Sequence, residues 1–345
     1  MHRAIRSMFL SSCLSACLGL VASQNATALA LGADFSADYT ATSLGSVPGL
    51  PPLYGGLTFL DSNTLLIGGN ANTANGRLYT IDVVRGAGGH ITGFTGTATA
   101  FGSVGEYNDG GVVFGPGGVL FTSQWPVNML GQTKPGSTDE DKVINLAPLG
   151  VAGSHAALNF VPAGFGGAGQ MKLLSWSGGQ FYTATLVADG AGTFDIASIV
   201  QEDLDPLGAG IQNVPGGPEG FVYIDGANVA FGGNDSMLIS EYSAGTVGAY
   251  ELDANGNPLV ATRRDFLTGL TGAEGAAIDP VTGDFLFSTF GGGDQIVAVQ
   301  GFIAPPTCGQ PGQPDCPTPE PGTLPLVALV LLGVPAWHRL RRDKD

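Results

Sequence analysis

One pattern of residues occurs five times along the middle of this chain, and it limits the possible folds more than any other feature. A short apolar segment opened by glycine or alanine is followed by a turn and then by a second apolar strand. The five opening segments are Gly56–Phe59, Gly111–Phe114, Ala157–Phe160, Gly220–Tyr223 and Gly275–Ile278. Their starts lie 55, 46, 63 and 55 residues apart, and each interval has room for four short strands.

Repeats of this length built from short strands predict an all-β propeller of about five four-stranded blades, with six blades as the alternative. In the first repeat the third and fourth strands are visible as Arg77–Val84 and Ile91–Ala100. The fifth repeat has only three strands, the last within Gln295–Phe302, so we expect a segment at Asp34–Ser43 to supply the fourth and close the ring. A β-sandwich or a β-helix is the structural alternative, and neither requires the two ends of the domain to meet.

The composition agrees with many tight turns between short strands. Glycine accounts for 56 of the 345 residues and proline for 22, whereas only 12% of the residues are charged. Between residues 31 and 318 there are 26 acidic and seven basic side chains. Such a surplus of negative charge repels phosphate backbones, so we expect no nucleic-acid binding.

The N-terminus has the pattern of a secretory signal peptide, which we assign to residues 1–30. Basic residues precede an apolar run from Met8 to Val21, and small residues follow, which predicts cleavage after Ala28 or Ala30. The segment before Cys17 also resembles a bacterial lipobox, so lipidation at Cys17 stays open as an alternative. We expect the propeller to occupy residues 31–303.

The C-terminus has three parts. A proline-rich linker at 304–318 contains Cys308 and Cys316, which can form a disulfide in an oxidising compartment. An anchor segment at 319–345 then runs from Pro319, Glu320 and Pro321 through an uncharged membrane helix at Leu324–Trp337 to the basic residues Arg339, Arg341 and Arg342.

The anchor segment resembles the PEP-CTERM sorting signal, a tail recognised by exosortase in Gram-negative bacteria that make exopolysaccharide. The resemblance implies export, a transient inner-membrane anchor, processing near Pro319–Pro321, and release to the cell surface or extracellular matrix. Exosortase is the implied partner, and exopolysaccharide or matrix proteins are further candidates. An ordinary C-terminal anchor would share this topology but would not be cleaved.

Familiar catalytic motifs are absent from the middle of the sequence. Residues 31–318 contain only two histidines, His90 and His155, and no Gly-x-Ser-x-Gly elbow. The stretch Gly164–Gly169 matches a dinucleotide fingerprint in letters, but a strand follows it, so we interpret it as a hairpin loop. The stretch Asp253–Pro258 resembles a calcium loop but has proline at the sixth position, so it predicts a turn.

One set of residues remains as a candidate site. In a propeller the residues just before the innermost strands line one mouth of the central channel. In this chain they are Tyr54, Asp109, His155, Glu219 and Glu274, with Asp109 offset by one position from the two glutamates. The carboxylates of Asp109, Glu219 and Glu274 are candidate ligands of a Ca²⁺ ion, and a purely structural role for them is the alternative.

The fifth repeat, with its turn at Asp279–Asp284, loosely resembles NHL and lactonase-like propellers. That resemblance implies a second hypothesis, a calcium-dependent hydrolase of lactones or esters. The first hypothesis, which the scarcity of catalytic residues favours, is a non-catalytic surface or matrix protein. In such a protein the aromatic side chains of Trp125, Trp176, Tyr107 and Tyr182 offer stacking surfaces for sugars. A third hypothesis is a propeller that acts only as a spacer.

Overall fold

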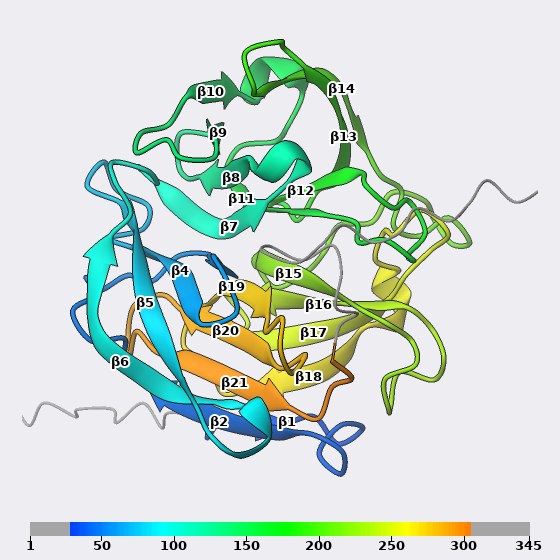
Figure 1. Ribbon diagram of the computed structural model, residues 1–345. Coiled ribbons are helices and arrows are strands. Elements are labelled where there is room, and N and C mark those ends of the chain that lie inside the picture. Colours follow the sequence, from blue (N-terminus) through cyan, green and yellow to red (C-terminus); the bar gives the residue numbers. More distant parts are fainter. Residues whose placement is uncertain (1–27, 305–345) are drawn as a thin grey trace, which may run out of the picture.

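Five antiparallel sheets stand around a common axis in the computed structural model, which describes residues 28–304 (Figure 1). The predicted propeller of five blades is confirmed. Blade one contains β3 (Leu57–Phe59), β4 (Thr64–Gly69), β5 (Arg77–Arg85) and β6 (Ile91–Ala100). Blade two contains β7 (Asn108–Phe114), β8 (Leu120–Gln124), β9 (Met129–Thr133) and β10 (Lys142–Asn145). Blade three contains β11 (His155–Phe160), β12 (Met171–Ser175), β13 (Phe181–Ala188) and β14 (Phe194–Gln201).

Blades four and five share the N-terminal segment. Blade four contains β15 (Pro218–Ile224), β16 (Ser236–Glu241), β17 (Thr246–Glu251), β18 (Arg264–Thr268) and, outside them, β1 (Ala30–Leu31). Blade five contains β19 (Ala273–Ile278), β20 (Phe285–Thr289), β21 (Ile296–Gln300) and β2 (Thr40–Gly45). Within residues 28–304 the only helical segments are four three-residue 3₁₀ turns, at Ala87–Gly89, Pro116–Gly118, Ala147–Leu149 and Val260–Thr262.

The ring closes as predicted, through pairing of the N-terminal β2 with the last strand β21. The closing strand begins at Thr40, later than expected, because residues 33–38 form turns that place Phe35 and Tyr39 in the core. The adjoining β1 pairs with β18 of the neighbouring blade. One continuous segment therefore joins blades four and five.

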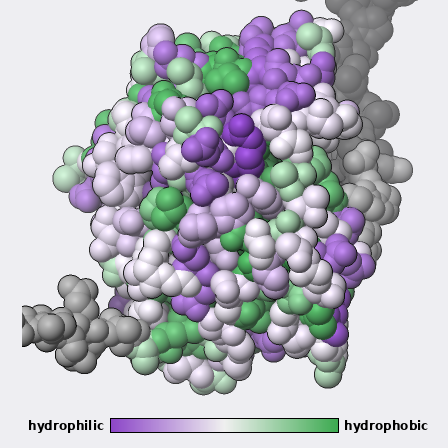
Figure 2. All heavy atoms as spheres, turned by 90° about the vertical axis from the view of Figure 1, so that its left-hand side faces the viewer, coloured by the Kyte–Doolittle hydropathy of each residue, from purple (hydrophilic) through white to green (hydrophobic). Residues whose placement is uncertain are grey.

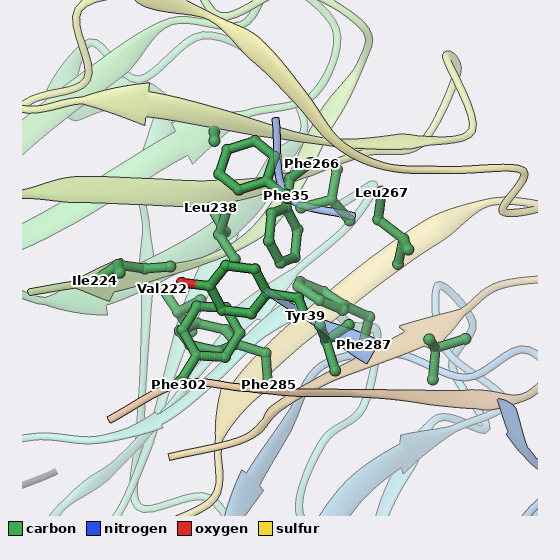
Figure 3. Packing of buried hydrophobic residues seen from close by; sticks show 14 of the residues in the cluster. Phe35, Tyr39, Val222, Ile224, Leu238, Phe266, Leu267, Phe285, Phe287 and Phe302 are labelled. Atoms are coloured by element: carbon green, nitrogen blue, oxygen red, sulfur yellow. The ribbon is translucent and has the colours of Figure 1, made fainter. Parts of the chain in front are cut away.

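Apolar side chains fill the spaces between the blades. The buried residues form five clusters, and each cluster lies between two neighbouring blades. The largest, between blades four and five, contains seven aromatic side chains, namely Phe35, Tyr39, Phe231, Phe266, Phe285, Phe287 and Phe302. Figure 3 shows Phe35, Tyr39 and Phe266 close together, with Phe285 beside Phe302. Burial of this kind stabilises a domain in proportion to the apolar area removed from water.

Glycines let the innermost strands approach one another at the axis. A Cβ atom on Gly56 would lie 2.8 Å from the carbonyl oxygen of Asp109, and one on Gly275 would lie 2.7 Å from the Cα of Gly56. A Cβ atom on Gly110 would lie 2.7 Å from the backbone nitrogen of Gly220, two blades away. Backbone therefore meets backbone at the axis, and the channel is closed at the level of Gly110.

No helix within residues 28–304 has the length and apolar character needed to cross a membrane. The signal peptide, the candidate lipidation at Cys17, the disulfide of Cys308 and Cys316 and the anchor segment 319–345 fall largely or wholly outside the described residues. On the surface in Figure 2, hydrophobic residues occur as separate patches among polar ones.

We expect Gly275→Ala to lower the free energy of unfolding by about 1–3 kcal/mol, the usual range for overpacking a tight interior. The new methyl group would meet backbone atoms of Gly55 and Gly56, which cannot rotate away. Urea unfolding followed by circular dichroism measures the change. The control is Gly93→Ala in β6, where a Cβ meets nothing within 4 Å. Equal midpoints for the two variants would show that the axis is not tightly packed.

Candidate metal site at the channel mouth

Backbone hydrogen bonds identify one equivalent position at the mouth of every blade. In each blade, the residue directly after the second strand donates its N–H to the carbonyl of a residue that lies before the first strand. The five donor and acceptor pairs are Asn70 and Pro52, Trp125 and Tyr107, Trp176 and Ser154, Tyr242 and Gly217, and Phe290 and Gly272. Two residues beyond each acceptor stand Tyr54, Asp109, Ala156, Glu219 and Glu274 in turn.

This register corrects two details of the sequence prediction. Asp109 occupies the same position as Glu219 and Glu274, because the irregular pairing of β7 with β8 absorbs the extra residue after Asp109 and not before it. Ala156, and not His155, represents blade three. The imidazole of His155 is buried beside Met129, whose carbonyl oxygen lies 3.1 Å from Nδ1, and burial lowers the pKa of His155 to about 4.

The fold brings the three predicted carboxylates together. Asp109, Glu219 and Glu274 come from three different blades, and one oxygen of each lies within 4.8 Å of the other two. The three residues are 0%, 4% and 1% exposed. We call them the carboxylate triad. Along the chain, Asp109 lies 110 residues before Glu219 and 165 residues before Glu274. The three side chains therefore come together only when the ring closes.

Four of the six oxygens of the carboxylate triad lack a well-aligned partner among the described residues. Both oxygens of Asp109, Oε2 of Glu219 and Oε1 of Glu274 are buried without a well-aligned hydrogen bond. Buried polar atoms are nearly always hydrogen-bonded, and an unpaired one is costly. Four such atoms in one place indicate a site for a partner, such as a cation, that is not part of the chain.

The electrostatics lead to the same conclusion. Burial raises the pKa of Asp109 to about 7. The pKa of Glu219 lies well above its usual range because of burial and the charge of Asp109. The pKa of Glu274 also lies well above its usual range, because of burial and the charges of Glu219 and Asp109. Without a cation, the triad therefore holds protons that exposed carboxyls would release.

A divalent cation fits this arrangement. Calcium binds oxygen ligands at about 2.3–2.6 Å, so oxygens on opposite sides of the ion are about 5 Å apart, close to the limit found here. The carboxamide of Asn72 lies beside Asp109, where it opposes part of the pKa rise, and its Oδ1 is also buried and unpaired. Asn72 is therefore a fourth candidate ligand that the sequence analysis missed, because it belongs to the loop after β4 and to no repeat position.

The remaining predicted residues have other environments. Tyr54 is buried in the core, where its hydroxyl accepts a hydrogen bond from the backbone N–H of Val47. Tyr182 is also a core residue, with its hydroxyl bound to the N–H of Ala152. Trp125, Trp176 and Tyr107 lie half-buried at the mouth that contains the triad. The sorting residues Pro319, Glu320, Pro321, Arg339, Arg341 and Arg342 lie outside the described residues.

The two motif look-alikes behave as predicted. Residues 164–169 lie in the turn region between β11 and β12, where no helix follows them. At the other stretch, Oδ1 of Asp253 accepts hydrogen bonds from the N–H groups of Asn255 and Asn257, which makes it a tight turn.

The opposite mouth of the channel is a separate funnel of about 710 Å³. Phe114, Leu158, Val222 and Ile278 line its walls, and Gly110 lies at its floor. Because the backbones of Gly110 and Gly220 meet at the axis, the funnel and the carboxylate triad are on different sides of the closure.

Comparison with known proteins gives a limited result. No family model matches the chain, and no curated protein is similar to it in sequence. Among solved structures, the glutaminyl cyclase of Myxococcus xanthus is 13% identical, with 77% of this chain and 98% of that chain covered and a TM-score of 0.45.

Two further structures are comparably distant. An auxiliary nutrient binding protein from Bacteroides ovatus is 12% identical over 76% of each chain, with a TM-score of 0.41. The PQQ-bound aldose sugar dehydrogenase from Streptomyces coelicolor is 13% identical, with 74% of this chain and 83% of that chain covered and a TM-score of 0.34. Similarity at this level assigns no activity to the present chain.

Proposed function

We propose that this protein is an exported, calcium-binding β-propeller with a non-catalytic binding or structural role at the cell surface or in the extracellular matrix. The observation that carries the proposal is the carboxylate triad, three buried acidic side chains from three blades, four of whose oxygens lack a well-aligned partner. A bound cation would supply the missing partners and the opposite charge at once.

The choice of calcium follows from the donor atoms. Carboxylate and carboxamide oxygens suit hard cations, and the triad includes neither sulfur nor imidazole. Calcium accepts irregular geometry and more ligands than magnesium, which demands a near-ideal octahedron and keeps several waters. A closed, three-carboxylate site with a nearby carboxamide therefore suits calcium better.

A structural effect of the ion follows from its position. The ligands belong to blades two, four and five, so the ion would connect strands that are distant in sequence. Binding to the folded state alone adds stability that depends on the ratio of ion concentration to dissociation constant. We infer that calcium stabilises the closed ring outside the cell, where export delivers the protein.

Export and sorting are supported by the resemblance of the C-terminal segment to the PEP-CTERM signal. In this proposal exosortase processes the anchor, and exopolysaccharide or matrix proteins are the partners of the released propeller. The alternative function is calcium-dependent hydrolysis of lactones or esters, and the calcium experiment below distinguishes it from a non-catalytic role.

Calcium titration by calorimetry tests the site directly. We expect binding in the micromolar range to the protein after treatment with a chelator. Glu219→Gln and Glu274→Gln each remove one charged ligand at nearly constant volume, so each should weaken binding by about tenfold or more. Glu251→Gln in β17, away from the channel, is the matched control. No heat of binding in a folded sample would contradict the metal site, and calcium-dependent cleavage of a lactone or ester would contradict the non-catalytic role.

Stability should depend on pH in a direction set by the raised pKa values. The folded state holds protons on the triad that the unfolded chain releases near pH 4, so the calcium-free protein should lose stability as pH rises from about 4 through 7. The loss is about 1.4 kcal/mol per pH unit for each proton held only by the folded state.

Thermal melts between pH 5 and pH 8, with EDTA or with calcium, measure this effect. Calcium should restore the melting temperature at pH 8 and should have little effect at pH 5, where protons compete for the ligands. Glu219→Gln, which cannot ionise, should flatten the pH dependence measured in EDTA. A melting temperature that rises with pH in EDTA would refute the assignment of protons to the triad.

The sorting proposal is tested in a host that contains exosortase. Replacement of Pro319, Glu320 and Pro321 by alanine should leave an unprocessed protein in the inner-membrane fraction, whereas the unchanged protein should reach the cell surface or the medium. Immunoblots of the fractions measure the distribution. Equal release of both forms would indicate an ordinary anchor or none.

A further inference from the structure

Four aromatic side chains repeat at one position around the mouth above the carboxylate triad. They follow the second strand of blades two to five and are half-buried. We call this set the aromatic arc, and its members are Trp125, Trp176, Tyr242 and Phe290. In blade one the same position holds Asn70. The sequence carries the signal for the arc, one aromatic residue directly after the second apolar strand of four repeats, but the sequence analysis did not use it.

The four rings are in continuous contact from blade to blade. Successive ring centroids are 6.5, 6.4 and 6.0 Å apart, and successive planes are inclined by 79°, 76° and 66°. Rings at such angles do not form the flat surface on which a sugar ring stacks. They stand as consecutive walls that present π faces and edges in turn, the arrangement with which proteins surround organic cations.

The aromatic arc lies within the electric field of the triad. Three of the four arc residues, all except Trp176, donate a hydrogen bond to a backbone carbonyl two residues before a member of the triad, a distance of about 6–7 Å along a strand. The pKa of Tyr242 is raised by burial and, next, by the charges of Glu274, Glu219 and Asp109. A ligand held by the arc would therefore meet the same negative potential.

Charge balance indicates the sign of that ligand. Three ionised carboxylates carry three negative charges, of which a calcium ion neutralises two. The seven lysines and arginines of residues 28–304 direct their charged groups to other partners, Arg85 to Asp279 and Arg263 to Glu241 among them, and none contacts the triad. One negative charge remains for a monovalent cation at the mouth.

We propose that the aromatic arc above the calcium-loaded triad is a binding site for one organic ammonium group, either quaternary or N-methylated. The inference rests on the proposed calcium site for its charge balance. The π faces of Trp125, Trp176 and Tyr242 contact the alkyl groups, and the triad supplies the long-range attraction. The ligand could be a small molecule or a side group of a larger partner, since both present the same chemistry to the mouth.

Titration of the calcium-loaded protein with choline and with its uncharged analogue 3,3-dimethylbutan-1-ol tests the inference. Intrinsic fluorescence reports binding because two of the three tryptophans of the chain, Trp125 and Trp176, belong to the arc. We expect choline to bind about tenfold tighter than the analogue or better, since the two differ only in the charge. Equal affinities, or no binding of choline, would overturn the proposal.

The second arm uses calorimetry with matched variants. Trp176→Leu removes one of the two middle rings of the arc and should weaken choline binding by about fivefold or more. Phe114→Leu removes a half-buried ring from the opposite funnel and should leave choline binding unchanged. Circular dichroism establishes that both variants are folded. Unchanged choline affinity in Trp176→Leu would overturn the proposal.

A third arm replaces choline with neutral oligosaccharides. A fluorescence change with oligosaccharides and none with choline would overturn the proposal in favour of sugar stacking. The calcium titration is a separate measurement on the same protein, so loss of choline binding with calcium binding intact would refute only this inference.

Discussion

Close contact between backbones at the axis is the constraint on which the rest of the structure depends. Five inner strands meet there, and at Gly56, Gly220 and Gly275 there is no room for even a methyl group. A wider ring would keep the same blades but would separate their first residues. Because the ring is narrow, side chains from blades two, four and five converge within 4.8 Å at the mouth.

The same convergence has an energetic consequence. Apolar clusters between the blades favour a closed ring, whereas the carboxylate triad opposes closure whenever its members are ionised, because like charges repel and burial removes their hydration. A cation bound to the triad would replace this repulsion with attraction and would then favour closure of the ring. The N-terminal segment, with β1 on blade four and β2 on blade five, holds the ring closed independently of that ion.

The two mouths of the channel differ in chemistry because the axis is closed between them. The triad and the aromatic arc face one mouth, which combines negative charge with π surfaces, whereas no charged side chain of residues 28–304 lines the opposite funnel. Each mouth is formed by the loops of several blades, so a small change in one blade alters the site without altering the fold. In such a fold the scaffold and the site are separate, so the fold alone does not determine the function.

The sequence by itself determined the blade count, the order of the strands and the use of an N-terminal strand for closure, because these depend on periodic apolar residues and glycine turns that are local in the chain. It also singled out Asp109, Glu219 and Glu274, since each precedes the apolar segment of an inner strand, although the structure places all three at the start of the strand itself. Their register at the mouth, the place of Ala156 and not His155 in blade three, and the position of Asn72 beside Asp109 were decided by the tertiary structure. The physical reason is that an irregular strand pairing shifts a side chain by one position, and a loop residue reaches the axis only after distant blades have closed around it.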